Sequence, residues 1–465
     1  MRLVIRRAAL VAAGGLTAAL TAARAASGAL ATALVASAVL TASGAGIPSL
    51  HAQAPDTAAA VRALHAFSTA CRQDGGQLWG ITLCGPVVLV DPQSRFAVAN
   101  EADPDGRFVR VGDVYVGVLP AEMLVANTAV NWGGRRWAMA LMPVPDSVPA
   151  AVALLAHESF HRIQPALGLH VRDPGNAHLA ERDGRLWLRL ELRALAAALQ
   201  ADGIASRTHI RNAMLFRAAR HDVFAGADTL EAALELNEGL AEYTGVRLAY
   251  GDSAAARAAA LARAFELRTS YVRALGYGTG PAFGLLLDRH AAGWRTRIGG
   301  IASLAEELRR SLGISAADLD IAAALATVAG YGHDDIAASE DARVAEYEAR
   351  VASYRSALLD GPVLILRHTR FSGTFNPNQI VPLGDAGSVY PTGVFQAEWG
   401  RLEVTDGALV ASDFNTITVA APTPAALVAT GNTIEGPGWI LHLSPRWRIV
   451  PAPRTGSYQA IPPTP

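Results

Sequence analysis

The spacing of apolar and polar residues divides the chain into an Ala-rich start and three further stretches. Residues 78–145 alternate short runs of β-branched and aromatic residues with Gly, Pro and Asp, which predicts a small, mainly antiparallel sheet. Residues 148–359 place apolar residues at helical spacing, which predicts a helical bundle. Residues 362–465 return to short strand-like runs, which predicts a β-sandwich or a small barrel. We therefore expect an α+β protein that ends in an all-β region.

Domain boundaries are expected where this pattern changes. Residues 1–54 would form a targeting segment, 55–360 a domain that combines the sheet with the bundle, and 361–465 a C-terminal β-rich domain. The expected strands cover residues 78–85, 86–92, 95–102, 107–120, 136–145, 363–371, 394–404, 408–414 and 439–450. The expected helices cover residues 57–71, 148–164, 186–199, 207–220, a segment around Glu238, 254–275 and 281–289, followed by two or three more that end near residue 360.

The first helix of the predicted bundle carries His157, Glu158 and His161 in the pattern H-E-x-x-H. Residues four apart lie on one face of a helix, so both imidazoles can bind the same metal ion. Glu158 is turned by about 100° around the helix and can reach a water molecule on that ion. Two imidazoles beside a carboxylate suit hydrolysis with Zn²⁺. The alternative is an ordinary solvated helix end without a metal.

The same helix has signals for its start and its end. Asp146 or Ser147 can act as the N-cap residue, and Pro149 suits the first helical turn. Pro165 cannot continue the helix and is expected to end it. The motif would therefore lie in the last turns of an apolar helix, where a metal ion would satisfy its buried polar side chains.

A catalytic zinc ion usually has three protein ligands and one open position, so a third ligand is needed. Three downstream glutamates are candidates for it. Glu181 lies in the tetrapeptide ERDG, which is typical of a turn. Glu191 lies in a strongly amphipathic helical segment, LWLRLELRALAAAL. Glu238 lies in the segment ELNEGLAEYTG.

The combination of HESFH with the later NEGLAEY resembles the gluzincin metallopeptidases of the zincin superfamily. The resemblance covers residues 146–290 and implies a zincin-like catalytic domain in which Glu238 is the third zinc ligand. It also implies that Glu242 accepts the N–H group of a ligand histidine and so fixes its tautomer. The segment GYGTGPAFGLLLD resembles the helix start of gluzincin aminopeptidases, in which a tyrosine steadies the oxyanion. Tyr277 would be that tyrosine here, and a residue that only packs a turn is the alternative.

Four glutamates near this point share a helical spacing. Glu231, Glu235, Glu238 and Glu242 are separated by four, three and four positions, so we expect one acidic stripe on a helix. An ordinary solvated face would have the same pattern. Gly239 costs the helix about 1 kcal/mol relative to alanine. Close approach of another helix backbone would explain this glycine and would favour Glu238 as the ligand.

Composition excludes several other chemistries. The chain contains no lysine and all 40 basic residues are arginine, which excludes Schiff-base lysines, Ser-Lys dyads and the phosphate-binding G-x-x-x-x-G-K-[ST] loop. No G-x-S-x-G nucleophile elbow occurs, and no G-x-M-E-N, the stretch by which gluzincin aminopeptidases bind a free amino terminus. The formal net charge of −1 gives no electrostatic reason to expect nucleic acid or an anionic membrane as a partner.

The start of the chain indicates export. MRLVIRR is a basic segment, an Ala-rich stretch follows, and the small residues near 49–54 suit cleavage of a signal peptide. Arg24 divides the stretch into two apolar segments, so a retained N-terminal membrane anchor is the alternative. Cys71 and Cys84 are too few for a four-cysteine zinc site, and in an exported protein we expect them to form a disulfide. A buried pair of free thiols is the alternative.

These observations predict an exported zinc metallopeptidase that cleaves a peptide or protein substrate with zinc-activated water. It would be periplasmic, secreted or anchored to the envelope. The rival hypothesis is a non-catalytic envelope protein, which would keep a structural zinc site and bind protein or glycan through its β domain. A fourth protein ligand would distinguish the two, because a structural site is closed. His170 or His178 would be the candidates for that ligand.

Overall fold

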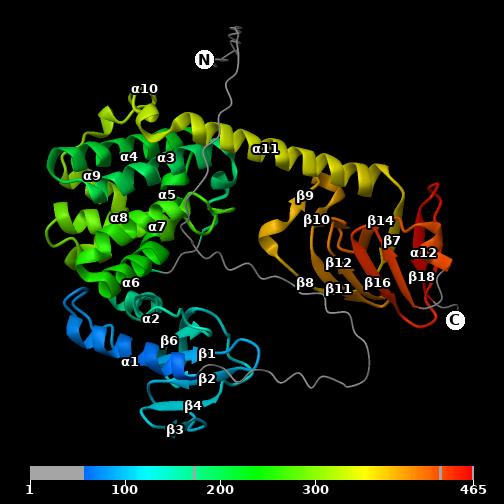
Figure 1. Ribbon diagram of the computed structural model, residues 1–465, viewed down its shortest axis with the longest axis horizontal. Helices are drawn as coiled ribbons and strands as arrows, with labels where there is room; N and C mark the ends of the chain where they lie inside the picture. Colours follow the sequence, from blue (N-terminus) through cyan, green and yellow to red (C-terminus); the bar gives the residue numbers. More distant parts are fainter. Residues whose placement is uncertain (1–56, 171–173, 429–431, 463–465) are drawn as a thin grey trace, which may run out of the picture. The chain divides into compact units, whose positions relative to one another are not determined.

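The computed structural model describes residues 57–170, 174–428 and 432–462. The predicted signal peptide or membrane anchor at residues 1–54 lies outside the described residues. Helices and several sheets share the chain, and its C-terminal region is rich in strands, so the architecture is mixed α+β as predicted (Figure 1). Within the described ranges, no helix combines the length and the apolar character that crossing a membrane requires.

The first sheet has six strands in the order β3-β4-β2-β1-β6-β5. Neighbouring strands pair antiparallel, apart from β1 and β6, which are parallel. The strands are β1 (Val87–Val90), β2 (Phe96–Ala99), β3 (Val109–Val111), β4 (Val114–Val118), β5 (Thr128–Trp132) and β6 (Arg135–Leu141). The pattern at residues 78–145 did not predict β5, which forms one edge of the sheet.

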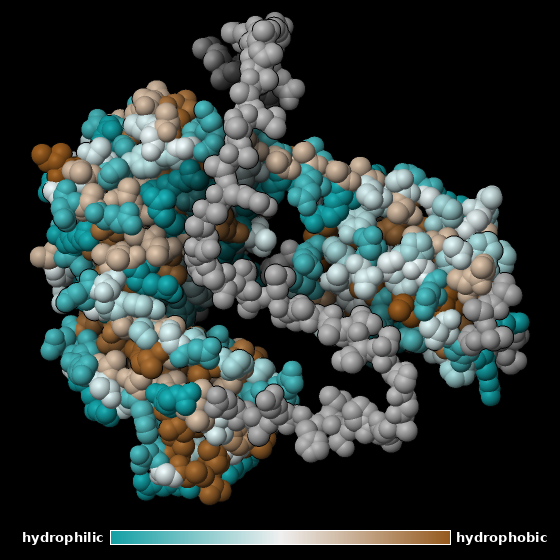
Figure 2. Space-filling view, viewed as in Figure 1, coloured by the Kyte–Doolittle hydropathy of each residue, from teal (hydrophilic) through white to brown (hydrophobic). Residues whose placement is uncertain are grey.

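Exposed valines mark the opposite edge of this sheet. Figure 2 shows hydrophobic residues gathered where β3 and β4 lie. Val109 on β3 and Val118 on β4 are 66% and 60% exposed, and Leu124 in the following loop is 67% exposed. The central strands are different, because all four residues of β1 are buried.

The predicted strand at residues 78–85 is wrong, because this segment forms turns. Trp79 packs against the ring of Phe160, with 5.2 Å between ring centroids, and its Nε1 donates to the hydroxyl of Thr244 at 3.0 Å. Trp79 is therefore packed against the helices that carry Phe160 and Thr244.

The disulfide between Cys71 and Cys84 is confirmed, with 5.3 Å between the two Cα atoms. It joins the helix α1 (Thr57–Asp74) to the turns that precede β1. Disulfides persist in oxidising compartments, so the bond indicates an oxidising, exported environment.

The helix with the H-E-x-x-H motif is α2 (Val148–Ile163). Ser147 is its N-cap residue, because the Ser147 side chain accepts a hydrogen bond from the backbone N–H of Ala150. Pro149 lies in the first turn, as expected. The α-helix ends at Ile163 and passes into a 3₁₀ turn, η1 (Gln164–Leu167), which contains Pro165.

The later helices largely follow the predicted order, with three corrected boundaries. They are α3 (Arg182–Gln200), α4 (Gly203–Val223), α5 (Ala227–Leu234), α6 (Leu240–Tyr250), α7 (Ala254–Phe265), α8 (Leu275–His290), α9 (Leu304–Ser311), α10 (Ile321–Leu325) and α11 (His333–Arg355). The tetrapeptide ERDG is not a turn, because α3 begins at its second residue, Arg182. Its glycine, Gly184, is explained by packing, since a Cβ there would lie 2.0 Å from the backbone oxygen of His178. The helix α7 ends before residue 275, and α8 begins before residue 281.

A π-helical turn, η3 (Glu235–Gly239), joins α5 to α6. The backbone of α8 approaches it closely, since a Cβ at Gly280 would lie 2.2 Å from Cα of Gly239. This contact confirms the reason expected for Gly239. The wider turn also changes the direction of side chains on either side of it, so the four glutamates do not form the single stripe that their spacing predicts.

The C-terminal strands form two sheets around a shared core. The seven-stranded sheet has the order β17-β18-β7-β14-β13-β10-β9, and the five-stranded sheet has the order β15-β16-β12-β11-β8. Both sheets contribute to one buried cluster, which includes Leu366 from the first and Leu402 from the second. The predicted strand at 394–404 is a hairpin, with a turn at Glu398 and Trp399. The predicted strand at 439–450 also divides, into β16 and β17.

The two sheets contain twelve strands among the described residues, with one short helix, α12, between two of them. They are β7 (Val363–Arg367), β8 (Ser372–Phe375), β9 (Val381–Pro382), β10 (Ser388–Tyr390), β11 (Gly393–Ala397), β12 (Gly400–Val404), β13 (Ala408–Val410), β14 (Thr416–Ala420), α12 (Pro424–Val428), β15 (Thr433–Gly436), β16 (Trp439–Leu443), β17 (Arg448–Pro451) and β18 (Tyr458–Ile461).

Candidate metal centre

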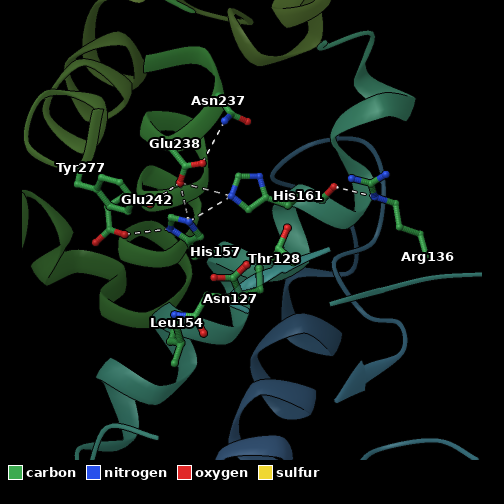
Figure 3. Close-up of a pocket in the computed structure, with 11 residues that line it drawn as sticks. Asn127, Thr128, Arg136, Leu154, His157, His161, Asn237, Glu238, Glu242 and Tyr277 are labelled. Carbon is green, nitrogen blue, oxygen red and sulfur yellow. Dashed lines mark hydrogen bonds and ion pairs between the residues drawn. The ribbon is translucent and has the colours of Figure 1, made fainter. Parts of the chain in front are cut away.

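Three side chains from α2 and η3 converge at one point (Figure 3). In the part of the chain that the structure describes, His157, His161 and Glu238 form a group whose ligand atoms all lie within 4.8 Å of one another. The helix α2 packs against α6, which continues from η3, and this packing brings the two histidines to the glutamate. The structure therefore brings together the three residues that were predicted to share a metal.

The distances within this group fit a tetrahedral ion. The Nε2 atoms of His157 and His161 lie 3.3 Å apart. Oε2 of Glu238 lies 3.3 Å from Nε2 of His157 and 3.6 Å from Nε2 of His161. Ligand atoms bonded at about 2.0–2.1 Å to one tetrahedral Zn²⁺ lie about 3.3–3.4 Å from one another. The group could hold a metal ion of this size.

Glu242 supports the first histidine. Its Oε2 lies 3.0 Å from Nδ1 of His157, so we assign the proton of the imidazole to Nδ1 from this hydrogen bond. That assignment leaves Nε2 of His157 free to bind a metal. Glu242 thus lies where the resemblance implies, one turn after Glu238.

The second histidine is supported by a chain of amides that sequence reasoning missed. Nδ1 of His161 lies 3.0 Å from Oε1 of Gln164, and Nε2 of Gln164 donates to Oδ1 of Asn237 at 3.1 Å. Asn237 then donates to Oε1 of Glu238 at 3.0 Å. This chain connects two ligands from different helices. The only signal in the sequence was position, because Gln164 lies three residues after His161 and Asn237 directly precedes Glu238.

Glu158 also lines the cavity beside the group. It is 2% exposed, and its Oε2 atom has no hydrogen-bond partner among the described residues. Burial raises the pKa of the Glu158 carboxyl above its usual value. A buried carboxylate oxygen without a partner is costly, and a water molecule on a bound cation would satisfy it. Glu158 is not one of the three candidate ligand residues, so its unpartnered oxygen would be free to accept a hydrogen bond from such a water molecule.

Tyr277 contacts both Glu238 and His157. Its hydroxyl donates to Oε2 of Glu238 at 2.6 Å, and its ring stacks on His157 with 5.6 Å between centroids. Burial, with the carboxylate of Glu238 beside it, raises the pKa of the Tyr277 hydroxyl above its usual value. Tyr277 belongs to the first turn of α8 and not to a preceding turn, so a helix holds its position.

The electrostatics of the group favour positive charge. Burial lowers the pKa of His157, but the hydrogen bonds to Glu238 and Glu242 outweigh it and raise the pKa to about 10. Burial would raise the pKa of Glu238, but its hydrogen bonds with His157 and His161 hold that pKa well below its usual range. Two carboxylates beside two imidazoles therefore stabilise a cation.

Glu191, the alternative third ligand, lies in a different cluster. Its Oε1 accepts from Nε of Arg217 at 2.7 Å, and its Oε2 accepts from Arg220 at 2.6 Å. Glu231 and Glu235 belong to the same cluster, which we call the arginine cluster. Glu231 accepts from Arg220 at 2.6 Å, and Glu235 accepts from Arg217. These carboxylates already have guanidinium partners.

The histidines proposed as a fourth ligand lie elsewhere. His178 is bonded through Nε2 to Oε1 of Glu231 at 2.7 Å and therefore belongs to the arginine cluster. His170 lines a second cavity, of about 710 Å³. Among the described residues, neither joins the group of His157, His161 and Glu238.

The group opens into a cavity of about 250 Å³. Besides Asn237, its lining includes four residues that sequence reasoning did not single out: Asn127, Thr128, Arg136 and Leu154. Asn127 directly precedes β5, and Thr128 is its first residue, so one edge of the sheet borders the cavity. On the outer side of this edge, no described strand pairs with β5.

Comparisons of the chain with protein-family models, with curated proteins and with solved structures find no match. The structure itself offers the group of His157, His161 and Glu238, which could hold a metal ion.

Proposed function

We propose that the protein is an exported zinc-dependent peptidase with a zincin-like catalytic region of the gluzincin type. One observation carries the proposal. Three ligand atoms lie 3.3–3.6 Å apart, and a buried carboxylate oxygen of Glu158 has no partner among the described residues beside them. A metal site without a neighbouring base, or a base without the ligands, would not support hydrolysis.

Each side chain of the centre would have a separate task. His157, His161 and Glu238 would hold the ion, which when bound activates a water molecule and polarises the substrate carbonyl. Glu158 would accept a proton from that water and pass it to the leaving nitrogen. The hydroxyl of Tyr277 would donate a hydrogen bond to the oxyanion. Glu242 would keep the imidazole of His157 in the tautomer that binds metal.

The edge strand β5 supports a peptide as the substrate. Among the described strands it pairs with β6 alone, so the backbone groups on its other side are not used by the six-stranded sheet. An extended chain can add to such an edge through backbone hydrogen bonds. Thr128 lines the cavity, so a peptide bound there would pass the metal centre.

The first experiment is metal analysis combined with cleavage of a broad peptide library. We expect the purified protein to hold about one Zn²⁺ per chain, and a chelator to abolish cleavage until zinc is restored. Glu158→Gln is the matched variant, because it keeps the ligands and removes the base. It should keep zinc and lose about 10²–10⁴-fold in hydrolysis.

The same experiment distinguishes a zinc peptidase from a non-catalytic protein with a structural zinc site. Full zinc content without cleavage of any library member would contradict the peptidase proposal and favour the structural role. Unchanged cleavage by Glu158→Gln would show that the mechanism is wrong, even if zinc is present.

A further inference from the structure

Arg136 lines the cavity of the metal centre and comes from β6. It is the single arginine among the described residues of this lining, which also contains Glu158, Glu238 and Glu242. The Arg136 side chain is held in place, because its Nε donates to the backbone oxygen of His161 at 3.2 Å. Figure 3 shows it on the side of His161 away from Tyr277.

Capping of α2 accounts for only part of this arrangement. The carbonyl of His161 is among the last of the helix, and an arginine can satisfy such a group. That contact uses one of the five N–H donors of the guanidinium. Within the described residues, the Arg136 side chain has no ion pair and no other hydrogen bond.

The neighbouring arginines have other partners. Arg135 pairs with Glu101 at 2.8 Å, and Arg162 donates to the backbone oxygens of Thr82 and Cys84 at 3.1 and 2.9 Å. Arg136 differs from both because it lines the cavity, where four of its five guanidinium donors have no partner among the described residues. A guanidinium fixed by one hydrogen bond can still bind a carboxylate through two parallel hydrogen bonds.

We propose that Arg136 binds a carboxylate of the substrate, so that the enzyme acts on peptides with a carboxylate close to the cleaved bond. The inference rests on the proposed peptidase function. The three glutamates of the cavity would repel an anionic substrate, and Arg136 is the fixed cation in the lining that offsets this. The cavity of about 250 Å³ is smaller than most ligand pockets, which span about 300–1,000 Å³, so only groups near the cleaved bond can reach Arg136.

The carboxylate can come from two sources, the C-terminus of the peptide or an Asp or Glu side chain. The test therefore uses N-acetylated peptides in matched pairs. One pair has the same sequence with a free or an amidated C-terminus, and the other is amidated and differs by Glu or Gln beside the cleaved bond. The zinc-loaded protein should cleave the charged member of at least one pair with about 10–150-fold higher kcat/KM, the range of a hydrogen bond to a charged group.

Variants assign this preference to Arg136. Arg136→Gln should lose the preference and cleave both members of the pair at similar rates. Arg135→Gln is the matched control, since it removes the same charge from an exposed neighbour that pairs with Glu101, and it should keep the preference. Arg136→Lys keeps the charge but not the two parallel donors, so it should keep part of the preference for the charged peptide. This variant replaces Arg136→Gln in the test if Arg136→Gln does not fold.

Two results would overturn the proposal. Equal kcat/KM for both members of every pair in the wild type would show that Arg136 only caps α2. An undiminished preference in Arg136→Gln, or in Arg136→Lys if Arg136→Gln does not fold, would assign it to another group.

A failure of the peptidase proposal is distinguishable from a failure of this one. If the wild type cleaves no peptide, calorimetry with the same peptides on the zinc-loaded protein tests Arg136 alone. Tighter binding of a charged member, lost in Arg136→Gln, would support the carboxylate site without catalysis. Equal binding of the members of each pair would exclude it.

Discussion

Two groups of glutamates lie on the same helical run, and their charges are compensated in different ways. Before and at the start of the π turn, Glu231 and Glu235 face the guanidinium groups of Arg217 and Arg220 in the arginine cluster. Near the end of the turn and beyond it, Glu238 and Glu242 face the imidazoles of α2. In the first group each carboxylate has a guanidinium partner, and in the second group, among the described residues, neither carboxylate has one.

The two groups of glutamates differ because one has arginine partners and the other has histidine partners. Arginine stays protonated, so each guanidinium neutralises a carboxylate permanently and gives it several hydrogen bonds. Burial opposes ionisation of Glu231, but Arg220 holds the pKa of that carboxyl well below its usual range. A neutral imidazole cannot neutralise a carboxylate, and its Nε2 is an acceptor that needs a proton or a metal. Identical acids therefore form buried ion pairs in one place and a group that could hold a metal ion in the other.

The largest expected effect separates the histidines of the two groups. His157→Ala and His161→Ala should each abolish zinc binding, because two ligands do not hold the ion in a catalytic site. His221→Ala is the matched control, since Nε2 of His221 lies 2.9 Å from Oε2 of Glu231 in the arginine cluster. It should keep about one Zn²⁺ per chain by metal analysis. Full zinc content in both ligand variants would refute the site.

The next effect separates the glutamates. Glu191→Gln leaves buried arginines without a full complement of carboxylates, so it should lower the free energy of unfolding by about 3–5 kcal/mol and keep zinc. Glu238→Gln should weaken zinc binding. Denaturant unfolding and metal titration of both variants measure the two properties. Loss of zinc in Glu191→Gln with retention in Glu238→Gln would mean that the third ligand is misassigned.

A smaller effect, on stability, is expected at the contact between α8 and the π turn η3. The Cβ of Gly280→Ala would lie 2.2 Å from Cα of Gly239, so the helix has to move away from η3. We expect a loss of about 1–3 kcal/mol of stability. Gly330→Ala is the control, because no atom lies within 4 Å of a Cβ there, and it should change stability by less than about 0.5 kcal/mol. Equal thermal shifts in the two variants would argue against a tight contact.

The smallest effect concerns the support of His157. Glu242→Ala should weaken zinc binding by about 10–100-fold, since the imidazole loses the acceptor that orients it. Glu242→Gln, which keeps an amide oxygen as acceptor, should lose less. Competition with a chelator measures both affinities. An unchanged affinity in Glu242→Ala would show that the hydrogen bond at 3.0 Å does not orient the ligand.

Local patterns in the sequence were sufficient for several features. The start of α2 at Ser147 and Pro149 depends on backbone groups within one turn, so the nearby residues determine it. The spacing of His157, Glu158 and His161 follows from helix geometry in the same way. The disulfide could be expected from the count of cysteines and the signs of export.

Several features that depend on contacts between distant segments were not predicted. A close approach to Gly239 was expected, but not that the glycines of α8, between two expected helices, supply it. The segment at 78–85 has the composition of a strand, but helices bury its Trp79. Local propensity is worth a few tenths of a kcal/mol per residue, and burial of one aromatic side chain outweighs it.

The sequence alone identified the glutamates and the histidines, but not how they are paired. Spacing placed Glu231, Glu235, Glu238 and Glu242 on one face, and it left Glu191 and Glu238 as competing ligands. Packing of α4 against α3 gives Glu191 its arginines, and packing of α2 against α6 gives Glu238 its histidines. A buried charge takes the partner that the neighbouring helix brings to it, because leaving it unpaired costs several kcal/mol. Which helix lies beside which residue is a property of the tertiary structure.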